Sequence, residues 1–171
     1  MAMTVNLEYK IAKADDLETV LAVLRDAALW LEAKEVDQWQ NYIKPADDLR
    51  EWIEQGISGR EVFLVYRNQK AIATFRLQWA DLMFWPDKND NVSGYIHSFA
   101  VVTEFRGQGV GDLILQWIES ECLKRYKKFL RLDCNSKNAG LQKYYLDRGF
   151  KVVETREAQG YLNVFFEKDL I

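Results

Sequence analysis

One stretch decides how this sequence folds: Arg106–Gly107–Gln108–Gly109–Val110–Gly111. It follows an apolar, strand-like run, Tyr95–Val102, and it precedes a helical pattern over Asp112–Tyr126. Glycines let the backbone come close to a ligand, and the free N–H groups at the start of a helix favour anions. The stretch therefore predicts a strand-to-helix turn that binds a phosphorylated ligand.

Two other glycine-rich motifs fit this stretch less well. A dinucleotide-binding turn requires G-x-G-x-x-G; Gly107 and Gly109 fit, but Asp112 stands where the last glycine is expected. A nucleoside triphosphate loop requires a lysine and a hydroxyl residue after its last glycine, and neither follows Gly111. A glycine-rich turn without a ligand remains the structural alternative.

A second segment completes the pattern. A strand-like run, Leu130–Asn135, is followed by Asn138, by Tyr144–Tyr145 on a short helical stretch, and by Gly149–Phe150. Together with Arg106-x-x-Gly109-x-Gly111, this order and spacing resemble the pyrophosphate loop and tyrosine helix of the GNAT acetyltransferases. The resemblance covers about the last half of the chain; the first half agrees only in the order of its elements.

The resemblance implies an α/β fold with a twisted, mixed β-sheet and helices on both faces. It also implies that two parallel strands, Tyr95–Val102 and Phe129–Cys134, splay apart around the cofactor. The amide-rich pantetheine arm would then pair with the exposed backbone of Phe99–Val101.

The periodicity of the remaining sequence predicts elements in the order βααβββαβαββ. Asp15 or Asp16 is the expected N-cap of a first helix with a Leu17–Leu24 stripe, and Pro45 starts a second helix that Gly56 and Gly59 end. The other predicted strands are Leu7–Ile11, Val62–Tyr66, Ala71–Leu77, Phe129–Asp133, Lys151–Glu154 onward and Leu162–Glu167.

The resemblance also assigns roles to residues. Acetyl-CoA is the implied cosubstrate, and Tyr145 is the implied acid that protonates the departing thiolate. The N–H group of Phe99 would hold the developing oxyanion. Asn138 would contact the cofactor arm, or cap the tyrosine helix. The full set of implied cofactor contacts is Phe99, Ala100, Val101, Arg106, Gly107, Gln108, Gly109, Val110, Gly111, Asp112, Asn138 and Tyr145.

His97 is the single histidine of the chain. In an alternating strand it shares a face with Tyr95 and Phe99. Its neutral ring could take a proton from the acceptor or from a bridging water, and a purely structural histidine is the alternative. Cys134 could carry an acetyl group, but a small buried hydrophobe is the favoured interpretation. Glu104 is expected to be solvated.

Aromatic residues point to the acceptor side. Trp30 and Trp39 lie near the first helix, and Trp85 lies in the loop Asp81–Asn91 before the ligand strand. The resemblance places such segments over the acceptor, where rings and His97 could bind an apolar or cationic body. The alternative is that these rings belong to the core.

Composition narrows the class of protein. The chain has 171 residues, 49% of them hydrophobic, which predicts a single domain over residues 1–171 with a proper core. A net charge of −3 argues against a nucleic-acid partner. Neither a membrane span nor a signal peptide is recognisable. Cys122 and Cys134 suggest no disulfide framework or metal site. We expect a cytoplasmic protein. The sequence allows a homodimer but does not specify the oligomeric state.

These observations predict an enzyme that moves acetyl from acetyl-CoA to a primary amine of a small molecule or peptide by direct attack. A non-catalytic acyl-CoA-binding or sensing module on the same fold is the first alternative, because a fold does not guarantee chemistry. A nucleotide-dependent oxidoreductase is the second. No metal is expected.

Overall fold

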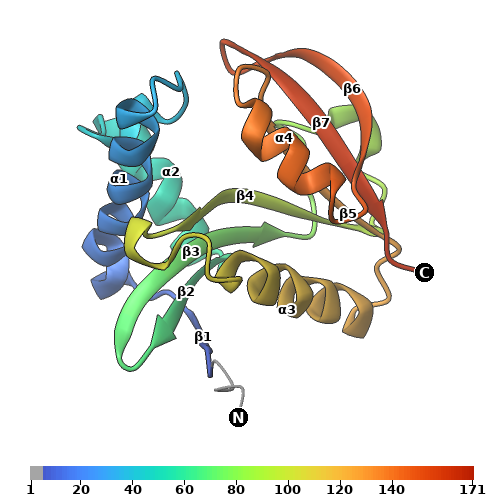
Figure 1. Cartoon of the computed structure of the whole chain (residues 1–171). Coiled ribbons are helices and arrows are strands. Elements are labelled where there is room, and N and C mark those ends of the chain that lie inside the picture. The colour runs from blue at the N-terminus through green and yellow to red at the C-terminus, as the bar shows by residue number, and fades with distance from the viewer. Residues whose placement is uncertain (1–5) are drawn as a thin grey trace. The chain divides into compact units, whose positions relative to one another are not determined.

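A computed structural model of the protein describes residues 6–171. Within them, the elements follow the predicted order (Figure 1). The strands are β1 (Glu8–Ile11), β2 (Val62–Arg67), β3 (Lys70–Gln78), β4 (Ser93–Val101), β5 (Phe129–Asn135), β6 (Lys151–Ala158) and β7 (Tyr161–Asp169). The helices are α1 (Leu17–Ala33), α2 (Asp47–Ser58), α3 (Val110–Lys124) and α4 (Ala139–Leu146).

The strands form one open sheet in the order β1-β2-β3-β4-β5-β7-β6. The β4–β5 pair is parallel, whereas the β1–β2, β2–β3, β5–β7 and β6–β7 pairs are antiparallel. The predicted mixed α/β class is therefore confirmed.

The chain divides into two compact units that interleave along the sequence. Unit 1 comprises residues 1–35, 39–76 and 98–111; unit 2 comprises residues 36–38, 77–97 and 112–171. β3 and β4 each pass from one unit to the other. The prediction of a single domain over residues 1–171 stays a prediction.

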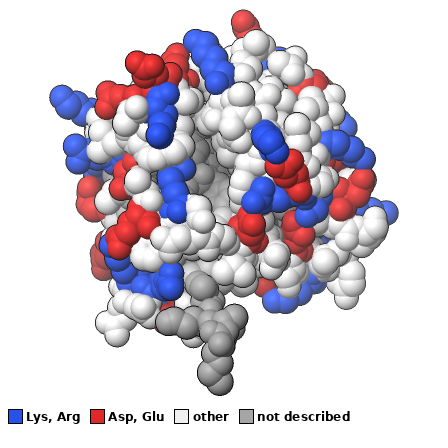
Figure 2. All heavy atoms as spheres, viewed as in Figure 1, with Lys and Arg blue, Asp and Glu red and all other residues white. Residues whose placement is uncertain are grey.

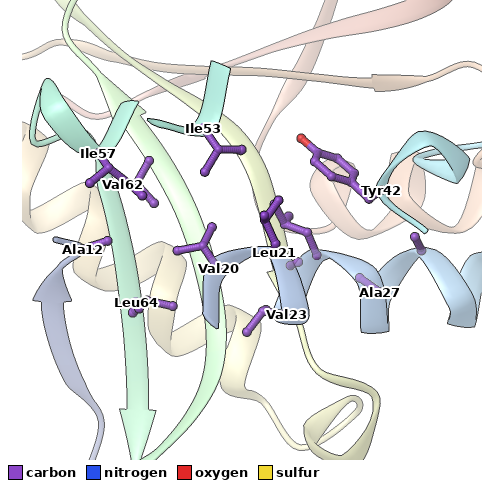
Figure 3. Packing of buried hydrophobic residues seen from close by; sticks show 13 residues of the cluster. Ala12, Val20, Leu21, Val23, Ala27, Tyr42, Ile53, Ile57, Val62 and Leu64 are labelled. Carbon is purple, nitrogen blue, oxygen red and sulfur yellow. The ribbon is translucent and has the colours of Figure 1, made fainter. Parts of the chain in front are cut away.

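The core of unit 1 is the apolar stripe of α1 packed against α2 and β2 (Figure 3). Val20, Leu24 and Ala27 recur at the three- and four-residue spacing of one helix face, and each is at most 1% exposed. They share a cluster with Ile53 of α2 and Leu64 of β2. This packing of α1 against α2 and β2 supports the part of unit 1 that carries the glycine-rich turn of residues 106–111.

In unit 2, α3 and α4 pack on one face of the sheet. A Cβ atom added to Gly94 of β4 would stand 2.6 Å from the sulfur of Cys122 in α3, so only glycine permits this close approach. Tyr145 of α4 packs against Phe166, which pairs with Leu132 of β5. Because successive side chains alternate, Arg131 and Asp133 of β5 project to the opposite face.

Some predicted boundaries were wrong. α3 starts two residues before Asp112 and ends at Lys124, because Tyr126 adopts a left-handed φ of 57°. Asp16 is the N-cap residue of α1, as predicted, but its side chain does not cap the helix; its carboxylate accepts the N–H of Lys13 in a short 3₁₀ turn. Gly56 lies inside α2 rather than ending it.

Charges are mixed on the surface in view. Figure 2 shows Lys and Arg side chains interspersed with Asp and Glu. Within residues 6–171, no helix has the length and apolar character needed to cross a bilayer.

Candidate functional site

The glycine-rich turn of unit 1 has the backbone that its sequence predicts. Gly107 and Gly109 have φ of 70° and 76°, a region that favours glycine. No heavy atom lies within 4 Å of the place where a Cβ would stand at either residue. α3 begins directly afterwards at Val110, and its first N–H groups have no partner within the helix. The turn is therefore open and suited to an anion.

Helix α1 holds this turn in place. The carboxylate of Asp26 accepts hydrogen bonds from the N–H of Thr103 at 2.6 Å and from its hydroxyl at 2.8 Å. The guanidinium of Arg106 lies 4.2 Å from the ring centroid of Trp30. Burial lowers the pKa of Arg106, against the opposing charge of Asp26. Trp30, predicted to contact the acceptor, therefore gives a ring face to Arg106.

Strand β4 runs without a break from Ser93 to Val101 but contains one residue with a positive φ. Ser98 has a φ of 49°, a left-handed conformation that is costly for a residue other than glycine. Its hydroxyl lies 3.0 Å from the hydroxyl of Tyr42. A left-handed residue breaks the alternation of a strand, so the face predicted to hold both His97 and Phe99 is interrupted between them. In unit 1, the ring of Phe99 packs edge-on against buried Phe75.

In unit 2, β4 and β5 separate early. Their parallel pairing covers Ser93–Tyr95 opposite Phe129–Arg131, whereas β5 stays paired with β7 as far as Asn135. His97 and Asp133 follow the last paired residues on their strands. This early end of the pairing agrees with the expected splay.

His97 lies between two carboxylates. Its Nε2 atom is 2.5 Å from Oδ2 of Asp81, and its Nδ1 atom is 3.8 Å from Oδ1 of Asp133. The ring of Phe84 lies 4.7 Å away, centroid to centroid. The imidazole is buried, and the close carboxylate of Asp81 favours a proton on Nε2. This arrangement can orient a base.

The two carboxylates have different surroundings. Burial tends to raise the pKa of Asp81, but hydrogen bonds from His97 and from the N–H groups of Phe84 and Met83 lower it below its usual value. Burial raises the pKa of Asp133 to about 6, against the opposing charge of His97. The ionised form of Asp81 is therefore stabilised by its hydrogen bonds, whereas the ionised form of Asp133 is poorly stabilised by its surroundings.

A buried arginine fixes the loop that carries Asp81. Arg131 is 3% exposed and donates to Glu167 at 2.8 Å and to the carbonyl of Lys88 at 2.6 Å. It also pairs with Asp90 at 2.9 Å. These bonds tie residues 88–90 to β5 and β7, two interior strands of the sheet. Asp81 itself accepts the N–H of Phe84 at 2.9 Å, which closes a local turn.

Tyr145 lies in the apolar layer between α4 and the sheet. It is 4% exposed, and its ring packs against Phe150 and Phe166. Within residues 6–171 its hydroxyl makes no hydrogen bond to another residue. Burial raises the pKa of Tyr145 well above its usual value, so the phenol holds its proton at neutral pH. It can serve as a proton donor but not as a base.

Two predicted cofactor contacts have structural partners. Asn138 caps α4 by accepting the N–H of Leu141 at 3.1 Å, and its amide donates to Gln38 at 2.7 Å. The carboxylate of Asp112 accepts from Arg148 at 2.5 Å and from the hydroxyl of Tyr144 at 2.8 Å. The hydrogen bond from Arg148 lowers the pKa of Asp112. Their contacts with a cofactor stay predictions.

Cys134 is unsuited to covalent chemistry. It is 3% exposed, and burial raises the pKa of its thiol to about 12. The interpretation as a small buried hydrophobe agrees with this. The described residues contain no cluster of histidine, cysteine and carboxylate side chains that could hold a metal ion.

Comparison with known proteins decides the family. Residues 28–170 match the sequence model of the acetyltransferase (GNAT) domain. This chain belongs to the GNAT acetyltransferase family. It is 31% identical over 163 residues to the uncharacterized N-acetyltransferase YesJ of Bacillus subtilis, covering 91% of this chain and 86% of that protein. It is also 22% identical to the S-alkylcysteine N-acetyltransferase of the same organism, over 95% of this chain and 89% of that protein.

Solved GNAT structures share the fold. An acetyltransferase of Listeria monocytogenes superposes with a TM-score of 0.78 at 22% identity, covering 99% of this chain and 98% of that one. The PaiA N-acetyltransferase of Thermoplasma acidophilum, solved in complex with coenzyme A, gives a TM-score of 0.74 at 18% identity, over 96% and 99% of the two chains.

The predicted acceptor rings of this GNAT chain differ in exposure. Trp39 is half-buried in unit 1, has a φ of 60°, and packs edge-on against Tyr42. Trp85 is 1% exposed and packs between Tyr95 and Phe165 in unit 2. The prediction that Trp85 binds the acceptor is wrong, because the loop after Asp81 folds back onto the sheet and buries the ring in the core.

Replacing Trp85 with alanine is therefore expected to lower the free energy of unfolding by about 3–5 kcal/mol, the usual cost of removing a buried large ring. Urea denaturation would measure this. Leu82→Ala in the same loop, where the side chain is 71% exposed, is the control and should cost less than about 0.5 kcal/mol. Equal stability of the two variants would mean that Trp85 is not a core residue.

Sequence reasoning missed three residues of this candidate site: Asp81, Asp133 and Arg131. Asp81 lies 16 positions before His97 in a loop, so no periodic pattern links them. The sequence predicts Asp133 and Arg131 only as members of a strand. The sequence feature that could have identified them is the charged residues at alternating positions of an otherwise apolar strand, because such residues are rarely buried unless they are paired.

Proposed function

We propose that this chain transfers the acetyl group of acetyl-CoA to a primary amine by direct attack. The observation that carries the proposal is the position of His97, whose imidazole is held by Asp81 in a chain of an acetyltransferase family. The imidazole is buried, has a fixed orientation and lies near the point where β4 and β5 separate. Such a group supports proton removal from an amine more readily than it supports a role in ligand sensing alone.

The open turn supports coenzyme A as the acyl carrier. The glycines of residues 107–109 and the start of α3 offer N–H groups to a pyrophosphate. The Thermoplasma acidophilum relative was solved with coenzyme A, which supports the same carrier here. The backbone of Phe99–Val101 is the proposed edge for the pantetheine arm, and the N–H of Phe99 the proposed oxyanion donor.

In the proposed reaction, His97 takes one proton from the acceptor ammonium, and the neutral amine attacks the thioester carbonyl. The carbon–sulfur bond breaks as the carbonyl re-forms, and Tyr145 gives its proton to the departing thiolate. The second proton of the attacking nitrogen leaves through solvent, which reprotonates Tyr145. The sum is one acetamide, one free thiol and one released proton. Positioning supplies much of the expected rate gain.

A panel of amines tests this function through release of free thiol from acetyl-CoA. The panel contains 2-phenylethylamine, 1,4-diaminobutane, a short peptide with a free N-terminus, and S-methylcysteine, which the name of one relative suggests. At least one amine should accelerate thiol release and yield its acetamide. Tight binding of acetyl-CoA with no acceleration by any amine would instead favour the non-catalytic acyl-CoA-binding alternative.

A double-variant cycle tests whether Asp81 acts through His97. His97→Gln should lower kcat by about 10²-fold, and Asp81→Asn by about tenfold, because the imidazole loses its orienting carboxylate. The double variant should be no slower than His97→Gln alone, since residues that act as a unit are not additive. Fully multiplicative losses would show that Asp81 acts independently of the base.

A further inference from the structure

The carboxylate of Asp133 is the least satisfied polar group beside His97. Its side chain is 12% exposed, and within residues 6–171 it accepts no side-chain hydrogen bond. Its nearest charged-group contact is Nδ1 of His97 at 3.8 Å, beyond hydrogen-bond range. Burying a carboxylate without donors is costly, so its position calls for a partner that the chain itself does not supply.

Neighbouring cations of unit 2 are committed elsewhere. Arg156 adds a favourable charge near Asp133, but its guanidinium donates to Glu154 at 2.8 Å and to the carbonyl of Phe84. Asp81, the carboxylate that faces Nε2 of His97, already accepts from His97 and from a backbone N–H group. Asp133 therefore differs from Asp81 in having acceptor capacity to spare.

We propose that Asp133 binds the ammonium group of the acceptor directly, alongside His97, an inference that rests on the proposed acetyl transfer. A primary ammonium carries three N–H groups, so it can donate to the carboxylate of Asp133 and also face the imidazole. A hydroxyl acceptor carries only one hydrogen and no charge. Asp133 thus selects a cationic primary amine over an alcohol of the same shape.

The proton balance of the first step follows from this placement. One N–H bond of the bound ammonium breaks, and its proton passes to the imidazole of His97. The nitrogen keeps the electron pair and becomes the neutral nucleophile. The imidazolium then lies between the carboxylates of Asp81 and Asp133, which stabilise its charge. Asp133 stays ionised and keeps a hydrogen bond to the amine as it attacks.

Asp133→Asn tests this role, with Asp169→Asn as the matched control at the exposed end of β7. The asparagine keeps the shape but loses the charge. For whichever amine of the panel the wild type acetylates, kcat/KM should fall about 10–10²-fold, the loss expected for a charged hydrogen bond. Calorimetry should show unchanged affinity for coenzyme A. Asp169→Asn should match the wild type in both measurements.

Thermal melts separate this role from a structural one. Burial raises the pKa of Asp133 from 3.8 to about 6, so the stability that its protonated form contributes is lost as pH rises through 6. Asp133→Asn should therefore melt above the wild type at pH 8, and the difference should shrink toward pH 4. The titratable and charged groups that interact with Asp133 are those of His97, Asp81, Arg156, Cys134 and Tyr145, and they remain in the variant. A lower melting temperature at pH 8 would indicate a stabilising ion pair with His97 and overturn the proposal.

Different results would contradict the proposed acetyl transfer and the proposed role of Asp133. If the wild type acetylates no amine of the panel, the proposed function falls, and the role of Asp133 falls with it. If the wild type acetylates an amine and Asp133→Asn does so with kcat/KM within twofold, acetyl transfer stands and the ammonium-binding role is wrong. In the wild type, 2-phenylethanol should inhibit far more weakly than 2-phenylethylamine; equal inhibition would also overturn the role of the charge.

Discussion

Replacing Tyr145 with phenylalanine is expected to lower turnover by about 10²–10⁴-fold, the usual contribution of a general acid. The phenylalanine ring can keep the contacts with Phe150 and Phe166. The lost hydroxyl makes no hydrogen bond to another residue within 6–171, so the fold should not suffer, and turnover should fall more than the affinity for acetyl-CoA. Only the proton donor is removed. Single-turnover measurements, in which chemistry limits the rate, would check this.

Tyr144→Phe is the matched control on the same helix. The hydroxyl of Tyr144 donates to Asp112 at 2.8 Å, so its loss removes a structural hydrogen bond rather than a proton donor. This variant should cost about 1 kcal/mol of stability and leave turnover within a few-fold of the wild type. If Tyr145→Phe turned over at the wild-type rate, protonation of the thiolate would have to come from water or another group.

Gly109→Val is expected to abolish binding of acetyl-CoA. Gly109 has a φ of 76°, and the space where its Cβ would stand is empty of protein atoms. A branched side chain would fill that space, where the pyrophosphate is proposed to lie, and would also strain the backbone. Isothermal calorimetry with acetyl-CoA would measure the loss. Nicotinamide nucleotides should bind the wild type far more weakly than coenzyme A does.

Gly160→Val separates the two causes. Gly160, in the turn between β6 and β7, has a φ of 81° and equally empty surroundings. Both substitutions therefore carry similar backbone strain, about 1–2 kcal/mol. Equal losses of melting temperature, with acetyl-CoA binding lost only in Gly109→Val, would assign the effect to the phosphate site. Unchanged affinity in a folded Gly109→Val would contradict the role of the turn.

Local chemistry made much of this fold predictable. A tight turn before a helix requires positive φ, and Gly107 and Gly109 are the residues that adopt it at little cost, so this turn could be predicted from the sequence. The stripe of α1 and the alternation of β5 also follow from spacing alone. A local rule failed at Gly56, which lies inside α2 and does not end it: close packing requires the glycine there, because a Cβ would come 2.8 Å from Val62.

The candidate site divides along the same line. The sequence by itself determined the glycine-rich turn before α3, the short helix that carries Tyr145 and the presence of one histidine, because each depends on residues adjacent in the chain. The tertiary structure decided which groups surround that histidine and which aromatic ring is core. Asp81 reaches His97 from 16 positions away, and Asp133 approaches from a different strand. No local pattern encodes such distances, since they arise only when the sheet brings separate strands and loops together.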